Sequence, residues 1–246
     1  MGDADGRRIA GFRVVMSWSD AGPVLPDRPV VSLRARVAGL LGAVLLAGGV
    51  AAAGVAVIAQ VHAPQPSAAA AGTTGASGRH ARTLQRSQPL SVDIPAIGVH
   101  SQLLHLGVNA DGSMRVPSLT TAADEAAWYK YSPTPGQLGA SVIEGHVDTY
   151  QGPAVFFRLG SLRPGNRVDV RLADGVTAVF RVTGVREYIK SRFPAKTIYG
   201  ATKRPVLILI TCGGSFDYAT RQYRSSTVVF AALAAARRPG HVEAAG

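Results

Sequence analysis

The stretch Val206-Leu-Ile-Leu-Ile-Thr-Cys212-Gly-Gly214 holds the only cysteine in the 246-residue chain. Its aliphatic run lies between Pro205 and two glycines, a pattern typical of a fully buried strand that ends abruptly. A cysteine at the exit of such a strand is fixed by the core on one side and open to a cleft on the other, which suits a nucleophile. Most free cysteines are small buried hydrophobes, so this stretch alone leaves both interpretations open.

Short apolar runs recur along residues 89–235 and predict further strands. The strongest hairpin signal is Asp174-Gly175, which separates two alternating runs. Helical patterns are few and short, around Thr120–Ala127 and Val155–Leu159. Many short strands with few helices predict an all-β, mainly β domain that forms a closed or nearly closed barrel. The strands are expected within 90–97, 103–108, 141–145, 168–172, 177–182, 206–210 and 227–231.

The sequence before this domain indicates a membrane anchor. Residues 1–36 mix arginines and aspartates with three prolines, which predicts a disordered cytoplasmic arm. Residues 37–61 carry no charge and are long enough for a transmembrane helix, which needs about 20 residues. Arg34 and Arg36 precede this run, so the domain is expected outside the cell, on a single-pass protein of the cell membrane. A cleaved signal sequence is the competing interpretation, but the run is longer than a usual signal.

The remaining segments complete the predicted organisation. Residues 62–88 are rich in Ala, Gly, Ser, Thr and Pro, a composition that favours a flexible extracellular linker. Residues 89–235 are long enough for one well-buried catalytic domain, and residues 236–246 are expected to form a disordered tail.

Composition and charge exclude several classes of function. The net charge of +11 suits an anionic cell envelope or nucleic acid, but no zinc-finger spacing, RNA-binding aromatic motif or basic helix supports nucleic acid. One cysteine allows no internal disulfide and no multi-cysteine metal site. The fold is therefore expected to depend on its hydrophobic core.

A cysteine nucleophile needs a proton-transfer partner and a group that stabilises an oxyanion. Of the six histidines, His146 is the best placed, because it follows a predicted strand that ends at Gly145. A surface histidine stacked near Tyr150 is an equally good interpretation of this position. The other five lie in predicted flexible segments or beside early strands. Arg224 precedes the last strand, which should pair beside the cysteine strand, although Arg221 lies close enough to compete for the same role.

These residues resemble the sortases, the cell-surface cysteine transpeptidases of Gram-positive bacteria. The motifs that match in order are Asp93-Ile-Pro95, Met114-Arg-Val-Pro117, Trp128-Tyr129, Pro135-Gly136, Gly145-His146-Val147-Asp148, Leu162-Arg-Pro-Gly165, Ile210-Thr211-Cys212 and the Arg224 strand. The run Cys212-Gly-Gly-Ser-Phe-Asp217 is most similar to the class F (actinobacterial) branch. The chain departs from the family at Glu144, where a small residue is expected, and at Ser225-Ser226, where Asp-Asn is usual.

The resemblance implies an eight-stranded sortase β-barrel with Cys212, His146 and Arg224 at one end. Cys212 would cleave a sorting signal of the Leu-Pro-x-Thr-Gly type through a thioester, and an amine of a peptidoglycan precursor would resolve it. Thr211 and nearby backbone groups, Gly213 among them, would assist Arg224 at the substrate. Phe193 and Tyr199 would line the groove for the signal peptide. No metal or organic cofactor is implied.

The sequence leaves other interpretations open. A non-catalytic, membrane-anchored β-barrel that binds wall components would keep Cys212 buried and inert. A sortase-like hydrolase would share the chemistry as far as the thioester and then use water. The exact sorting motif, the acceptor, a housekeeping or specialised role, and the oligomeric state are equally open.

Overall fold

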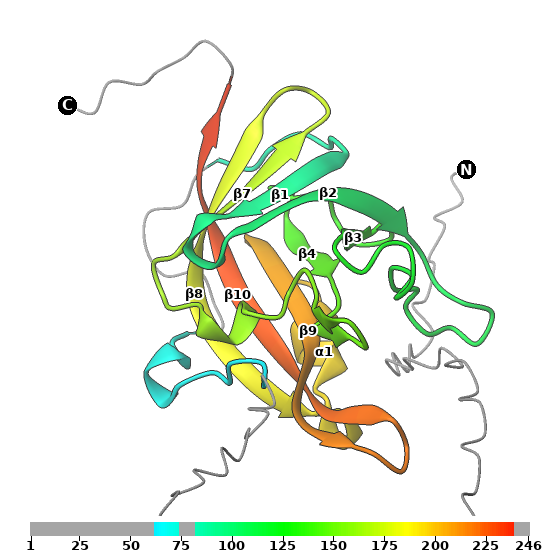
Figure 1. Cartoon of the computed structure of the whole chain (residues 1–246). Helices are drawn as coiled ribbons and strands as arrows, with labels where there is room; N and C mark the ends of the chain where they lie inside the picture. Colours follow the sequence, from blue (N-terminus) through cyan, green and yellow to red (C-terminus); the bar gives the residue numbers. More distant parts are fainter. Residues whose placement is uncertain (1–61, 74–81, 239–246) are drawn as a thin grey trace, which may run out of the picture. The chain divides into compact units, whose positions relative to one another are not determined.

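A ring of paired strands forms the fold (Figure 1). The protein is described by a computed structural model over residues 62–73 and 82–238. Within these residues, eight strands close into a barrel in the order β1-β2-β3-β4-β9-β10-β8-β7, and β7 pairs with β1. The barrel strands are β1 (Pro89–Ile94), β2 (Val99–Leu106), β3 (Ala126–Tyr129), β4 (Gly139–Glu144), β7 (Arg167–Leu172), β8 (Thr177–Ile189), β9 (Pro205–Asp217) and β10 (Gln222–Arg237).

The elements outside the barrel are short. Strands β5 (Asp148–Thr149) and β6 (Gly152–Pro153) form a small separate hairpin directly after β4. The helix α1 (Ala195–Tyr199) lies in the connection from β8 to β9. The 3-10 turns are η1 (Ala68–Ala70), η2 (Pro95–Ile97), η3 (Leu159–Ser161) and η4 (Lys190–Arg192). The all-β class and the closed barrel predicted from the sequence are therefore confirmed.

The sequence pattern predicted the hairpin pairing of strands but not the parallel pairings. Strands β7 and β8 form an antiparallel hairpin around Asp174-Gly175, and Gly175 has φ +81° as this tight turn requires. By contrast, β2 pairs with β3 and β4 pairs with β9 in parallel, which joins strands from distant parts of the chain. Parallel neighbours cannot be joined by a tight hairpin and need longer crossover connections.

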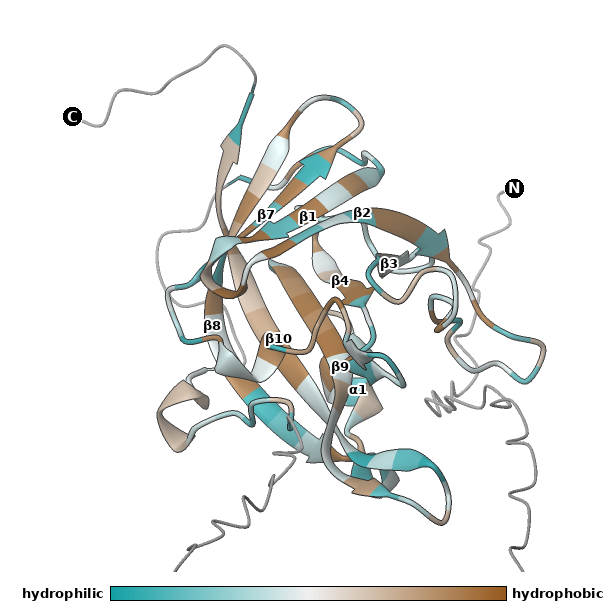
Figure 2. Cartoon of the chain, in the orientation of Figure 1, coloured by the Kyte–Doolittle hydropathy of each residue, from teal (hydrophilic) through white to brown (hydrophobic). Residues whose placement is uncertain are grey.

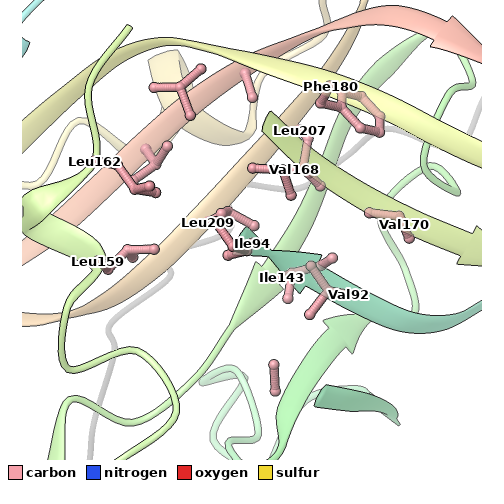
Figure 3. Close-up of a cluster of buried hydrophobic side chains, with 14 of the residues drawn as sticks. Val92, Ile94, Ile143, Leu159, Leu162, Val168, Val170, Phe180, Leu207 and Leu209 are labelled. Carbon is pink, nitrogen blue, oxygen red and sulfur yellow. The ribbon is translucent and has the colours of Figure 1, made fainter. Parts of the chain in front are cut away.

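Buried side chains form two clusters on opposite faces of β9. Leu207 and Leu209 belong to the large cluster that fills the barrel, part of which Figure 3 shows. Ile208 and Ile210 belong to a smaller cluster with Ile198 of α1. Successive side chains of a strand point to opposite faces, so the smaller cluster covers the outer face of the barrel. Figure 2 shows β9 and β10 mostly hydrophobic along the barrel and hydrophilic in the hairpin beyond it.

The expected helices at 120–127 and 155–159 are not formed. Residues 120–125 make turns, and Ala126 and Ala127 begin β3. Both alanines are fully buried between β2 and β4, so tertiary packing overrides their helical propensity. Residues 155–158 form a turn that leads into η3.

The predicted linker differs from the structure over residues 63–73, which lie against the barrel beside β8 (Figure 1). Ala70 is fully buried in the main core cluster, and the Thr73 amide donates a hydrogen bond to the Thr183 carbonyl at 2.9 Å. Arg186 donates to the carbonyl oxygens of Ala71 and Gly72. This close approach is possible because β8 has a glycine at this position, Gly184, where a Cβ would lie 2.6 Å from the Ala71 oxygen.

The predicted cytoplasmic arm and the predicted transmembrane segment 37–61 lie outside the described residues, as do 74–81 and 239–246. In the part of the chain that the structure describes, no helix is both long enough and apolar enough to span a bilayer.

The main core cluster gives a direct test of the fold. Leu209 is fully buried inside the barrel, so Leu209→Ala should lower the free energy of unfolding by about 2–5 kcal/mol through lost burial and a residual cavity. Leu138 is 58% exposed, and Leu138→Ala should change it by no more than about 0.5 kcal/mol. Urea unfolding followed by tryptophan fluorescence measures both. Equal losses in the two variants would contradict the assignment of the barrel core.

Candidate active site

The parallel pairing of β4 and β9 brings two candidate residues to one end of the barrel. Glu144 lies opposite Ile210, and the next amide, that of Gly145, donates to the Ile210 carbonyl at 3.2 Å. His146 follows this last hydrogen bond on one strand, and Cys212 lies two residues beyond it on the other. Since parallel strands reach the same edge of a sheet together, the two side chains leave the barrel at the same end.

Cys212 lies on the outer face of β9 and is 6% exposed. The alternation of the strand places it with Ile208 and Ile210, and it lies directly opposite Ser226 of β10. Burial raises the pKa of the Cys212 thiol to about 11. The ammonium group of Lys190 acts against this increase, while the carboxyl groups of Asp148 and Glu144 add to it. Near neutral pH the Cys212 side chain is therefore a protonated thiol.

His146 is held in a defined orientation. It is 2% exposed, and its Nε2 lies 2.6 Å from the Pro117 carbonyl oxygen. A carbonyl can only accept a hydrogen bond, so Nε2 carries a proton and donates it there. Nδ1 is then the nitrogen whose protonation can change during a reaction. The His146 carbonyl accepts a hydrogen bond from the Phe156 amide at 2.9 Å, which fixes the backbone as well.

The β9–β10 hairpin carries both candidate arginines. Arg224 lies two residues before Ser226 on β10, so strand alternation places it on the same face as Cys212. Its guanidinium forms an ion pair with Asp217 at 3.1 Å and is 67% exposed. Arg221, at φ 54°, instead donates to the Tyr150 hydroxyl at 2.6 Å. Each arginine thus has a partner in this structure. Arg224 is the better candidate for a position beside the sulfur, because it lies on the same face of the sheet as Cys212.

A bulge in β9 shapes the strand next to the cysteine. Gly214 has φ +73°, and the register between β9 and β10 shifts there, opposite Arg224. A Cβ at Gly214 would lie 2.7 Å from Ser225 Oγ and 2.8 Å from Glu187 Oε1. The second glycine after Cys212 is therefore needed for both its dihedral angle and its lack of a side chain.

The loop after His146 is tied to the hairpin that carries the arginines. Tyr223 of β10 donates a hydrogen bond to Asp148, two residues beyond His146. Burial raises the pKa of the Asp148 carboxyl, while this hydrogen bond and the nearby His146 lower it. The contact between Arg221 and Tyr150 joins the same two segments a second time. Asp148 was part of the sequence motif, but its partner could not be read from the motif.

The four residues expected to contact substrate lie in different places. Phe193 and Tyr199 pack on the outer cluster with ring centroids 5.9 Å apart, on the same side as Cys212. Thr211 is buried and alternates to the opposite face of β9, so its hydroxyl points away from the sulfur. Gly213 is paired with Ser225 of β10. A Cβ at this position would lie 2.5 Å from the Thr227 hydroxyl, so the site has no room for a side chain.

Two contacts at the site are not indicated by the sequence. Lys190 Nζ donates a hydrogen bond to Cys212 Sγ at 3.4 Å, from the connection that also carries Phe193 and Tyr199. The Gln65 side chain accepts a hydrogen bond from the Gly214 amide at 3.3 Å, from a segment predicted to be a linker. Neither contact follows from a local pattern, because both depend on how distant segments pack.

The sequence pattern of the sortase domain matches residues 92–234, more than half of the chain. The chain belongs to the sortase family. Sortases are cysteine transpeptidases, so this sortase is an enzyme of that class, and its single cysteine, Cys212, lies within the matched region.

Several solved sortase structures are similar to this sortase. The SrtA sortase from Actinomyces oris is 20% identical, with a TM-score of 0.45 over 67% of this chain and 91% of that chain. Sortase A from Corynebacterium diphtheriae is 19% identical, with a TM-score of 0.47 over 64% and 65%. Sortase A from Listeria monocytogenes is 15% identical, with a TM-score of 0.45 over 62% and 90%. No curated protein matches this sortase significantly.

Glu144, the departure noted in the sequence, is a wholly buried carboxyl group on β4. Neither of its oxygens has a hydrogen-bond partner among the described residues. Burial raises its pKa well above the ordinary value of 4.5. Tyr199 is affected in turn, since burial first and the Glu144 carboxyl second raise the pKa of its hydroxyl.

The raised pKa of Glu144 predicts a pH-dependent stability. The folded chain keeps this proton at pH values where the unfolded chain has released it, so stability falls as pH rises from the ordinary carboxyl pKa toward the raised one. Glu144→Gln is neutral at every pH and should match the wild type near pH 4. At pH 8 it should be more stable by about 1–3 kcal/mol.

Urea unfolding at pH 4, 6 and 8 measures this difference. Glu125→Gln, which removes a carboxyl group from a partly exposed position, is the matched control and should follow the wild type. An unchanged pH slope in Glu144→Gln would show that this carboxyl is not the source of the effect.

Proposed function

We propose that this sortase is a membrane-anchored transpeptidase that cleaves a sorting signal of the Leu-Pro-x-Thr-Gly type and joins the released protein to an amine of the cell wall. The proposal is supported by the parallel β4–β9 pair, after which His146 and Cys212 both follow at the same end of the barrel. The sequence run Cys212-Gly-Gly-Ser-Phe-Asp217 supports assignment to class F. The uncharged segment 37–61 supports a single-pass anchor with the barrel outside the cell.

Acylation begins at the Cys212 sulfur. The resting thiol gives its proton to Nδ1 of His146, and Sγ attacks the threonine carbonyl carbon of the sorting signal, which forms a tetrahedral oxyanion. The C–N bond to the glycine then breaks. The leaving amine takes the proton from His146, and the protein remains attached to Sγ as a thioester.

The second half of the reaction reverses these proton movements. An amine of a peptidoglycan precursor attacks the thioester and gives a proton to His146, and the C–S bond breaks as the new amide forms. Arg224 stabilises the oxyanion in both halves by leaving Asp217 for the substrate. Phe193 and Tyr199 line the groove for the signal. Gly213 contributes backbone contacts, and Thr211 does so only through its backbone because its hydroxyl faces the barrel.

The first test is a transpeptidation assay with the full-length chain. A Leu-Pro-x-Thr-Gly peptide and a triglycine acceptor should give a thioester adduct on the protein and a ligated peptide, both followed by mass spectrometry. Cys212→Ala should give neither product, and His146→Ala should lower kcat by about 10²–10⁴-fold. Peptide cleavage without ligation at saturating amine would instead identify a hydrolase. A Cys212 that forms no adduct and resists thiol reagents would favour a binding module.

The two arginines can be separated in the same assay. Arg224→Ala should lower kcat by about 10²–10³-fold, the usual cost of losing an oxyanion donor. Arg221→Ala removes a contact with the Tyr150 hydroxyl and should change kcat less than about threefold. Both side chains belong to the same hairpin, so each variant is the control for the other. A larger loss in Arg221→Ala would reassign the role.

A further inference from the structure

Lys190 reaches the nucleophile from a different part of the barrel. It is the first residue of η4, directly after β8 ends at Ile189. Ser226 of β10 lies opposite Cys212 on one side and opposite Tyr188 of β8 on the other. The side chains of Cys212, Ser226 and Tyr188 therefore form one row on the outer face, and Lys190 follows Tyr188 by two residues, in the turn η4.

The contact between the two side chains has a fixed direction. Lys190 Nζ lies 3.4 Å from Cys212 Sγ. An ammonium group has only donor hydrogens, so the sulfur must accept, and it accepts most strongly as a thiolate. The sulfur is almost completely buried, which weakens solvent screening and strengthens the attraction between the two charges.

We propose that Lys190 is a further catalytic residue of this sortase, because its ammonium group is the counter-ion that stabilises the Cys212 thiolate. The proposal rests on the proposed function in taking Cys212 as the nucleophile. The two arginines of the hairpin have other partners in the resting structure, Asp217 and Tyr150. In this proposal Lys190 stabilises the thiolate, His146 transfers the protons and Arg224 stabilises the oxyanion.

The surroundings of the sulfur make this cation important. Burial raises the pKa of the thiol most, Lys190 lowers it, and the carboxyl groups of Asp148 and Glu144 raise it further. Tyr223 of β10 is a further ionisable group that interacts with the sulfur. Once the thioester forms, the sulfur is neutral and Lys190 no longer has a charge to stabilise. When the thioester is resolved, the departing thiolate regains its partner.

The test measures how fast iodoacetamide alkylates the full-length protein between pH 7 and 9. The chain has one cysteine, so the label reports on Cys212 alone. Lys190→Met keeps most of the aliphatic stem and removes the charge. We expect its alkylation rate to fall at least about tenfold at each pH, which corresponds to one unit in the thiol pKa. Lys190→Arg should recover most of the rate, and its pH profile should return toward that of the wild type.

Lys196→Met is the matched control, since it removes an exposed lysine from the same connection, and should alkylate at the wild-type rate. A Lys190→Met profile that coincides with the wild type overturns the proposal. So does a loss of rate that Lys190→Arg does not recover. A variant that fails to fold would expose the thiol and alkylate faster, the opposite of the expected change. Alkylation needs no sorting peptide, so a missing transpeptidase activity would leave the Lys190 result interpretable.

Discussion

Hydrogen bonds between β4 and β9 hold together two segments that are far apart in the sequence, and the site exists because of them. The pairing runs from Gly139 with Pro205 to Glu144 with Ile210, in parallel, so both strands reach the catalytic end together. A shift of one residue in this register would turn Cys212 from the outer face into the barrel. Strand β10 pairs with β9 along most of its length and adds the arginine hairpin at the same end.

The site combines a buried sulfur with charged groups that come from several elements. Burial and two carboxyl groups disfavour the thiolate, while Lys190 favours it. The loop after His146 and the arginine hairpin are joined through Tyr223 and Asp148. The positions of His146 and Arg224 are therefore linked through this hydrogen bond. The ion pair between Arg224 and Asp217 lies in the same β9–β10 hairpin, so a substrate that replaces Asp217 as the partner of Arg224 would also affect this hairpin.

Local sequence patterns predicted those elements that depend mainly on neighbouring residues, such as tight turns and buried strands. The Asp174-Gly175 turn and the buried strand before Cys212 follow from turn chemistry and from hydrophobic runs, and both are present in the structure. The predicted abrupt end at the two glycines is wrong, because β9 continues to Asp217 by pairing with β10. The strand at Ala126–Tyr129 could not be predicted, because its alanines favour a helix until β2 and β4 bury them. The outward direction of Cys212 and the inward direction of Thr211 follow from strand alternation, which the sequence already contained.

Contacts between distant segments were beyond the sequence patterns. The parallel pairing that joins His146 to Cys212 was accessible only through the resemblance to a family. The packing of residues 63–73 on β8 depends on the missing side chain of Gly184, because a Cβ there would collide with the Ala71 carbonyl oxygen. No local sequence pattern indicates this contact. The reach of Lys190 to the sulfur depends on the whole connection between β8 and β9.

The parallel pair also has a consequence for how the chain folds. The segment between β4 and β9 contains β5 to β8 and α1, so the two strands meet only after a long loop has closed. Pairings of this kind are slow to form, because the entropy of loop closure is lost before the contacts are gained. The lone thiol remains accessible until that moment and is buried afterwards. Protection of this thiol from a reagent during refolding therefore reports when the barrel closes.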